Sequence, residues 1–318
     1  RGIFILIFLF ILIAMSLIIF FLFHNENKNE NKKINLLSKE TSILVNNWFL
    51  MYFLSVVLIG TVYPIFLEVL TNHKISIGPP FFNKLLSPFL ILFLISMSIG
   101  PNLNWINSKV LKINFKLIIL FILSLLISFL LLKNIGSKNL INTVLLSSAF
   151  YLFFITIKDF FSKNFKNYSQ KLSHFGFSLL ILSILLNSIF STEEIINLKV
   201  GEKHIFKKGS ITFKSIKNQK IENYQSIIGN FAIEDTNKKI IHLSPELRFY
   251  ENPITVTSEA DIKTNLYSDN FLVMNLVKGN DYFNIRYQEK AFMIWIWMSV
   301  LIMVIGIFTN ILKKKYEK

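Results

Sequence analysis

The hydrophobic positions of this chain fall into long continuous blocks. A helix needs roughly 20 mainly apolar residues to cross a bilayer, and seven blocks approach or exceed that length. They cover residues 3–23, 47–70, 85–104, 117–132, 140–158, 173–190 and 291–312. The fourth block is short, so it would span with little tilt or let its flanking lysines snorkel. The pattern therefore predicts a multi-span α-helical membrane protein with about seven transmembrane helices.

Between the sixth and seventh blocks the pattern changes to short runs in which apolar and polar residues alternate. Residues 211–216, 227–233 and 271–277 are examples, with turn residues such as Lys208-Gly209-Ser210 between the runs. Alternation with a period of two is typical of β-strands, and such turns indicate hairpins. About 100 residues are enough for one hydrophobic core.

These patterns divide the chain into three parts. We expect a transmembrane helical bundle of six spans over residues 1–191 and a small mainly-β domain over residues 192–290. A final transmembrane helix with a basic tail would follow over residues 291–318. The β domain would be inserted before the last helix, on the side of the membrane away from the cytoplasm.

The positive charge of the chain lies beside the spans. Region 192–290 is nearly neutral, with 14 Lys/Arg against 13 Asp/Glu, although the whole chain carries a formal charge of +15. Fifteen lysines occupy one set of loops, whereas the opposite loops hold four; the first set is 24–42, 105–116, 158–171 and 313–318, and the second is 71–84 and 133–139. Lysine-rich loops face the cytoplasm. We therefore expect the bacterial inner (cytoplasmic) membrane, with the C-terminus inside and the β domain in the periplasm. A mitochondrial inner membrane remains an alternative.

Composition limits the partners and the chemistry. Membrane lipid is the partner that the apolar blocks require, and no basic face with interleaved aromatic residues indicates nucleic-acid binding. The chain has no cysteine, which excludes disulfides and thiolate metal sites. We find no Ser-His-Asp order, no pair of catalytic carboxylates and no metal-ligand spacing, and we assign no catalytic residue.

One histidine lies among apolar residues. His174 follows the start of the sixth block by about one turn, and Gly176 leaves room for a close neighbour. A histidine inside a membrane usually faces the bundle interior and has a partner there. The residues leave three roles open: a structural hydrogen bond, a proton relay, or an axial ligand to haem iron.

Three further features have no assigned role. Glu68 lies near the outer end of the second block, and His73 follows in an outer loop, where we expect it on the surface. Gly78-Pro79-Pro80 predicts a rigid, non-helical turn. That turn would be either a docking surface or a simple re-entry into the membrane.

Several stretches, in order along almost the whole chain, match one family. The most specific is Lys74-Ile75-Ser76-Ile77-Gly78-Pro79-Pro80. The others are Arg1-Gly2-Ile3-Phe4-Ile5-Leu6, Gly60-Thr61-Val62-Tyr63-Pro64 with Glu68, Ile99-Gly100-Pro101, His174-Phe175-Gly176, Pro245-Glu246-Leu247-Arg248-Phe249-Tyr250, Thr257-Ser258-Glu259-Ala260-Asp261-Ile262 and Trp295-Ile296-Trp297. With these residues the chain resembles the CcmF family, the haem-lyase subunit of the cytochrome c maturation system.

The resemblance implies a function. Members of the family attach haem covalently to the Cys-x-x-Cys-His motifs of apocytochrome c outside the membrane. The implied cofactors are a substrate haem and an intramembrane haem b, whose iron His174 would hold as one axial ligand. The implied partners are apocytochrome c and other maturation subunits, namely a haem carrier and the subunits that handle apocytochrome.

The resemblance covers only the C-terminal half of the family. The family's tryptophan-rich outer loop, the histidines that flank it and the first intramembrane haem histidine have no counterpart among these residues. We expect a fragment or the product of a split gene, and the start at Arg1 favours a fragment. Such a chain would supply one axial ligand and would not act as a haem lyase alone.

Two functions of other classes remain open. One is a proton- or ion-coupled transporter in which His174 relays protons. That function needs further ionisable residues along a path, and the fourth and fifth blocks carry none in their interiors. The other is a non-catalytic assembly subunit that docks partners through the β domain.

Overall fold

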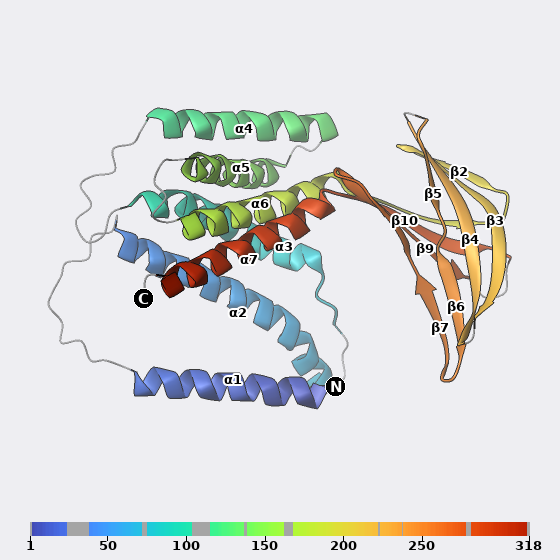
Figure 1. Ribbon diagram of the computed structural model, residues 1–318, viewed down its shortest axis with the longest axis horizontal. Helices are drawn as coiled ribbons and strands as arrows, with labels where there is room; N and C mark the ends of the chain where they lie inside the picture. The colour runs from blue at the N-terminus through green and yellow to red at the C-terminus, as the bar shows by residue number, and fades with distance from the viewer. Residues whose placement is uncertain are drawn as a thin grey trace.

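The computed structural model describes residues 2–23, 38–71, 75–103, 115–136, 139–161, 168–221, 223–236, 238–277 and 281–316. These residues form seven α-helices, one short 3-10 helix and ten β-strands. Figure 1 shows the helices after residue 38 gathered in a bundle, the first helix apart from them, and the strands in a separate sandwich beyond one end of the bundle. The sandwich lies between the sixth and seventh helices, which confirms the predicted fold class.

The helices correspond one to one with the predicted blocks. They are α1 Gly2–Leu22, α2 Lys39–Thr71, α3 Pro79–Ile99, α4 Phe115–Ile135, α5 Leu140–Phe160, α6 Tyr168–Phe190 and α7 Met293–Tyr316. By length and composition, α2 to α6 could each span a membrane, whereas the apolar parts found in α1 and α7 are the shorter segments Ile7–Leu22 and Met293–Thr309. The described part of the chain thus has five candidate spans and two further apolar helices in a multi-span membrane protein.

Helices α2 and α3 begin eight and six residues earlier than hydrophobicity indicates. Helix α2 begins at Lys39 because Ser38 caps it, with the Thr41 N–H donating to Ser38 Oγ at 3.3 Å. Helix α3 begins at Pro79, directly after an extended Gly78. The predicted non-helical turn is therefore wrong for both prolines: a proline needs no N–H partner in the first helical turn, and its fixed φ suits that position.

Helix α6 is held by neighbours on two sides. It lies along α7 and also packs against α5. An ideal Cβ on Gly176 would lie 2.7 Å from Met303 Cγ and 2.9 Å from the Ser299 carbonyl oxygen, so the α6–α7 contact needs a glycine there. On the α5 side, Thr156 Oγ1 and Ser178 Oγ share a buried hydrogen bond of 2.7 Å. These contacts set the position of the helix that carries His174.

The sandwich consists of two sheets whose paired strands are antiparallel. One has the order β1-β10-β9-β8, and the other has the order β2-β3-β4-β6-β7 with β5 beside β4. The strands are β1 Thr192–Leu198, β2 Lys203–Phe206, β3 Gly209–Ile221, β4 Tyr224–Asp235, β5 Ile240–Leu243, β6 Glu246–Glu251, β7 Ile254–Glu259, β8 Asp261–Thr264, β9 Ser268–Leu276 and β10 Phe283–Ala291. Phe213 and Phe231 stack in the core between the sheets, with ring centroids 4.3 Å apart.

Hydrogen bonds join the sandwich to the bundle where α6 ends and α7 begins. The Asn187 amide donates to the Ala291 carbonyl at 2.6 Å, and the Ala291 N–H donates to Ser191 Oγ at 3.0 Å. Trp295 of α7 donates its indole N–H to the Leu266 carbonyl at 2.9 Å. His174 lies toward the opposite end of α6, so the sandwich and the candidate site occupy opposite ends of the bundle (Figure 1).

Candidate functional site

His174 lies in the second turn of α6. It follows the first residue of the helix, Tyr168, by six positions, which places it about 9 Å along the helix axis at 1.5 Å per residue. The side chain is half-buried. It is thus close to the end of the bundle but not at its outermost turn, as the sequence predicts.

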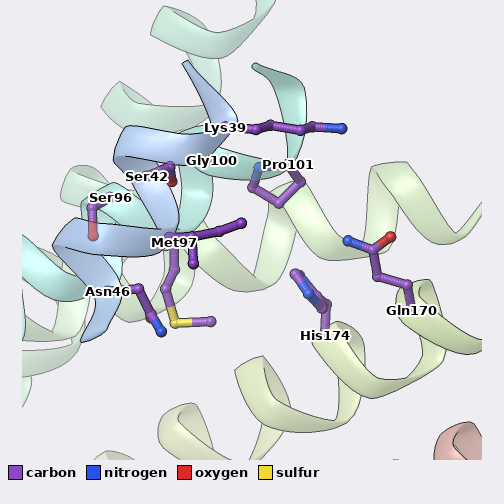
Figure 2. Close-up of a pocket in the computed structure, with 10 residues that line it drawn as sticks. Lys39, Ser42, Asn46, Ser96, Met97, Gly100, Pro101, Gln170 and His174 are labelled. Atoms are coloured by element: carbon purple, nitrogen blue, oxygen red, sulfur yellow. The ribbon is translucent and has the colours of Figure 1, made fainter. Parts of the chain in front are cut away.

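The His174 side chain opens onto a cavity of about 400 Å³ between α2, the end of α3 and α6. Ten described residues line it: Lys39, Ser42, Ile43 and Asn46 from α2, Ser96 and Met97 from the end of α3, Gly100 and Pro101 from the 3-10 helix Gly100–Asn102 that follows α3, and Gln170 and His174 from α6. Figure 2 shows His174 and Gln170 pointing from one side toward Pro101 and Met97. The site therefore combines three segments that are far apart in the sequence.

A glycine lies where the α2 and α3 walls of the cavity meet. The backbone N–H of Gly100, which follows α3, bonds to the Ser96 carbonyl. An ideal Cβ on Gly100 would collide with Ser42 Oγ, so a side chain at this position would force that hydroxyl to turn away, whereas Ser42 Cβ lies at an ordinary 3.6 Å. Gly100-Pro101, part of one stretch that resembles the CcmF family, thus forms a wall of the cavity.

The lining combines apolar and polar side chains. Ile43, Met97 and Pro101 supply apolar surface, whereas Asn46 and Gln170 supply amides. Pockets for small molecules and cofactors span about 300–1,000 Å³ and combine apolar walls with a few polar groups. A single imidazole facing such a cavity is a suitable donor to haem iron. The residues that line the cavity therefore fit a haem whose iron takes one axial ligand, His174, from this chain.

The other residues singled out in the sequence lie away from this cavity. Glu68 is exposed in the last turn of α2, and Gly78 precedes α3. His73 lies outside the described residues. His204 and His242 lie on strands β2 and β5 of the sandwich. Among the described residues, no group of three or more His, Cys, Asp or Glu side chains could hold a metal ion.

Hydrophobicity alone does not predict the α2 wall of the cavity. It places Lys39 and Ser42 in a loop, because the second apolar block begins at residue 47. The Ser38 cap was the signal that could have extended the helix to include them. Met97 carried no signal, because one methionine among apolar helix residues is ordinary.

The sequence of this chain is similar to sequences of known proteins. Residues 189–291 match the family model described as the CcmF C-terminal beta-sandwich. The chain is 28% identical over 291 residues to the cytochrome c-type biogenesis protein CcmF of Escherichia coli K12, and 26% identical over 296 residues to that of Pseudomonas fluorescens. Each match covers 89% of this chain and 45% of the relative, so the chain spans less than half the length of these relatives.

A solved structure has the same fold. The structure titled Cytochrome c Heme Lyase CcmF superposes with a TM-score of 0.66 at 20% sequence identity, over 86% of this chain and 45% of that one. The superposition extends well beyond the sandwich, because the sandwich is about a third of the chain. The chain is therefore similar to the C-terminal portion of CcmF proteins, and its sandwich matches the model of that family.

Proposed function

We propose that this chain contributes to the covalent attachment of haem to apocytochrome c, as the part of a membrane haem lyase that holds an intramembrane haem b. The observation that carries the proposal is that His174 opens onto a cofactor-sized cavity in a chain related to cytochrome c biogenesis proteins. His174 would be one axial ligand of the haem iron. The bound haem would supply a redox centre that keeps the substrate haem reduced.

The chain's own residues have three tasks in this proposal. His174 donates a ring nitrogen to the iron, so the imidazole must be neutral and correctly oriented. The α5 and α7 contacts of α6 hold in place the helix that carries the imidazole. Ile43, Met97 and Pro101 exclude water from the apolar faces of the ring system.

The membrane arrangement follows from the same proposal. The sandwich would face the periplasm across a bacterial inner membrane, and His174 would lie near the cytoplasmic side. Apocytochrome c, a haem carrier and the subunits that handle apocytochrome would be the partners. The exposed sheets of the sandwich offer them a water-facing surface.

Haem binding by the purified chain in phosphatidylcholine nanodiscs tests the role of His174. Ferrous haem bound through one imidazole has a characteristic iron–histidine stretching band in resonance Raman spectra. His174→Ala should abolish this band and lower the affinity for haem by about tenfold or more, because the iron loses its protein ligand. His204→Ala and His242→Ala, on the sandwich, are the matched controls and should leave both measurements unchanged. A band that persists in His174→Ala would exclude this histidine as the ligand.

A further inference from the structure

The hairpin of β8 and β9 carries two large apolar side chains at its tip. We infer that Leu266 and Tyr267 insert into the lipid headgroup region, on the side of the membrane where the sandwich lies. The sandwich then contacts the bilayer surface directly, in addition to its connections through α6 and α7. Haem binding by His174 is independent of this contact.

The tip is a two-residue turn with unusual residues. Strands β8 and β9 are paired, and the Asn265 N–H donates to the Ser268 carbonyl at 2.9 Å, so Leu266-Tyr267 forms the turn. Such turns in water are dominated by Gly, Asn, Asp, Ser and Pro. The turns of the β2–β3 and β6–β7 hairpins are more ordinary, with Lys207-Lys208 and Asn252-Pro253. The preferences of turns therefore do not account for a leucine and a tyrosine here.

Two hydrogen bonds hold the tip beside the beginning of α7. The Phe292 N–H donates to the Tyr267 carbonyl at 2.7 Å, and the Trp295 indole N–H donates to the Leu266 carbonyl at 2.9 Å. The apolar segment of α7 begins at Met293, directly after Phe292. In Figure 1, β10 runs from the sandwich to this point. The tip thus lies at the level where α7 enters the apolar layer.

The exposed side chains at this level suit the boundary between lipid and water. Leu266 and Tyr267 are 63% and 77% exposed, and Trp295 and Trp297 near the start of α7 are 40% and 63% exposed. Tyrosine and tryptophan are enriched at membrane interfaces, because one part of each side chain is apolar and the other is polar. Four large side chains of this kind near one helix end indicate a lipid-facing surface.

The charges on the hairpin indicate which lipids suffice. Residues 265–268 carry no charge, and the nearest charged residues along the hairpin, Lys263 and Asp269, have opposite signs. Attraction to anionic lipids is therefore not required, and burial of apolar surface drives the contact. A zwitterionic phosphatidylcholine bilayer is the simplest membrane that should bind the tip.

The depth of a fluorescent label measures the contact. The chain has no cysteine, so a single introduced cysteine carries the only label. The label is a nitrobenzoxadiazole, and the purified chain is placed in phosphatidylcholine nanodiscs that contain lipids with nitroxides at known depths. A label on Leu266→Cys should lie within about 5–10 Å of the boundary between headgroups and acyl chains. This substitution keeps the backbone carbonyl that bonds to Trp295.

Two further labels calibrate the measurement. Ile254→Cys is the matched control, because Ile254 is equally apolar and 91% exposed but lies on β7, away from the helices (Figure 1). Its label should be quenched by aqueous Co²⁺ and not by the lipid nitroxides. A label on Val304→Cys, which is 40% exposed on α7, should lie deeper than the label at residue 266. A label at residue 266 that behaves like the label at residue 254 would overturn the inference and favour a protein partner for the tip.

A second substitution tests the side chains themselves. In the chain labelled at residue 266, Tyr267→Asp should move the label toward water, because an ionised carboxylate is costly to remove from water. Tyr267→Phe should leave the depth unchanged. If Tyr267→Asp also leaves the depth unchanged, α7 alone sets the position of the tip, and the claim that these side chains bind lipid is wrong.

Discussion

The sandwich and the bundle are packed by opposite means. In the sandwich, large side chains fill the space between the sheets, and Phe213, Leu272 and Ile285 are all 0% exposed. In the bundle, the α6–α7 contact depends on small residues that let the two backbones approach. The first region faces water, where apolar burial drives folding. The second is apolar on its outside as well, so close fit must replace that driving force.

The outer surfaces of the two regions also differ: the sandwich carries ion pairs, whereas the bundle exposes apolar side chains. Ion pairs lie on the sandwich, such as Lys208 with Glu289 at 2.9 Å and Arg286 with Glu193. The bundle exposes apolar side chains, for example Trp48 at 73%. The cavity beside His174 is an exception in the bundle, because amides and a lysine line it. Packing between apolar helices does not by itself require these polar side chains.

The difference in packing predicts that a smaller side chain in the core destabilises the sandwich. Phe213→Ala should cost about 3–5 kcal/mol, because it empties a fully buried site and removes the stack with Phe231. Such a loss approaches the whole stability of a typical domain. Trypsin should then cleave quickly at Lys214 and Lys217, which are exposed on β3, while circular dichroism still reports the helices. Ile254→Ala is the control, since that side chain is 91% exposed. Slow cleavage of the Phe213 variant would show that the core is not cooperative.

The bundle should instead be disrupted by added volume. Gly176→Ala would bring a Cβ to 2.7 Å from Met303 Cγ and 2.9 Å from the Ser299 carbonyl oxygen. The backbone atom cannot rotate away, so α6 and α7 must separate, at a cost of about 1–3 kcal/mol. Thermal unfolding in detergent should detect the loss. Gly78→Ala, whose Cβ would meet only Pro80 Cδ at an ordinary 3.6 Å, should unfold like the unchanged protein. Equal stabilities for the two variants would contradict the close approach of α6 and α7.

The two regions also differ in how well the sequence predicts them. Alternation placed the strands well, because a strand with one buried face must alternate. Blocks of hydrophobicity found every helix but not its beginning: Ser38 and Pro79 fix where α2 and α3 begin, and both act through the backbone. His174 stood out because histidine is rare in lipid. Its neighbours could not be inferred, because α2, α3 and α6 meet only through tertiary packing.

A matched pair of hydroxyl substitutions extends the comparison to buried polar groups. The Tyr287 hydroxyl donates to Asn270 Oδ1 at 2.7 Å inside the sandwich. Tyr287→Phe leaves that buried oxygen without this donor and should cost about 1–2 kcal/mol. Ser178→Ala in the bundle should cost only about 0.6 kcal/mol, because Thr156 keeps its bond to the Phe153 carbonyl. Denaturant unfolding of the sandwich and thermal unfolding of the bundle measure the two losses.

The Tyr287 substitution also has a pH signature. Burial raises the pKa of the Tyr287 phenol above its ordinary value near 10. The unfolded chain therefore releases this proton at a lower pH than the folded chain. The contribution of Tyr287 to stability is complete below about pH 10, and it declines at up to about 1.4 kcal/mol per pH unit as the pH rises toward the folded-state pKa. Tyr287→Phe should remove this part of the alkaline decline, whereas Ser178→Ala should not change it. An identical decline in all three proteins would mean that water reaches Tyr287, and the sandwich core would then be less tightly closed than its packing indicates.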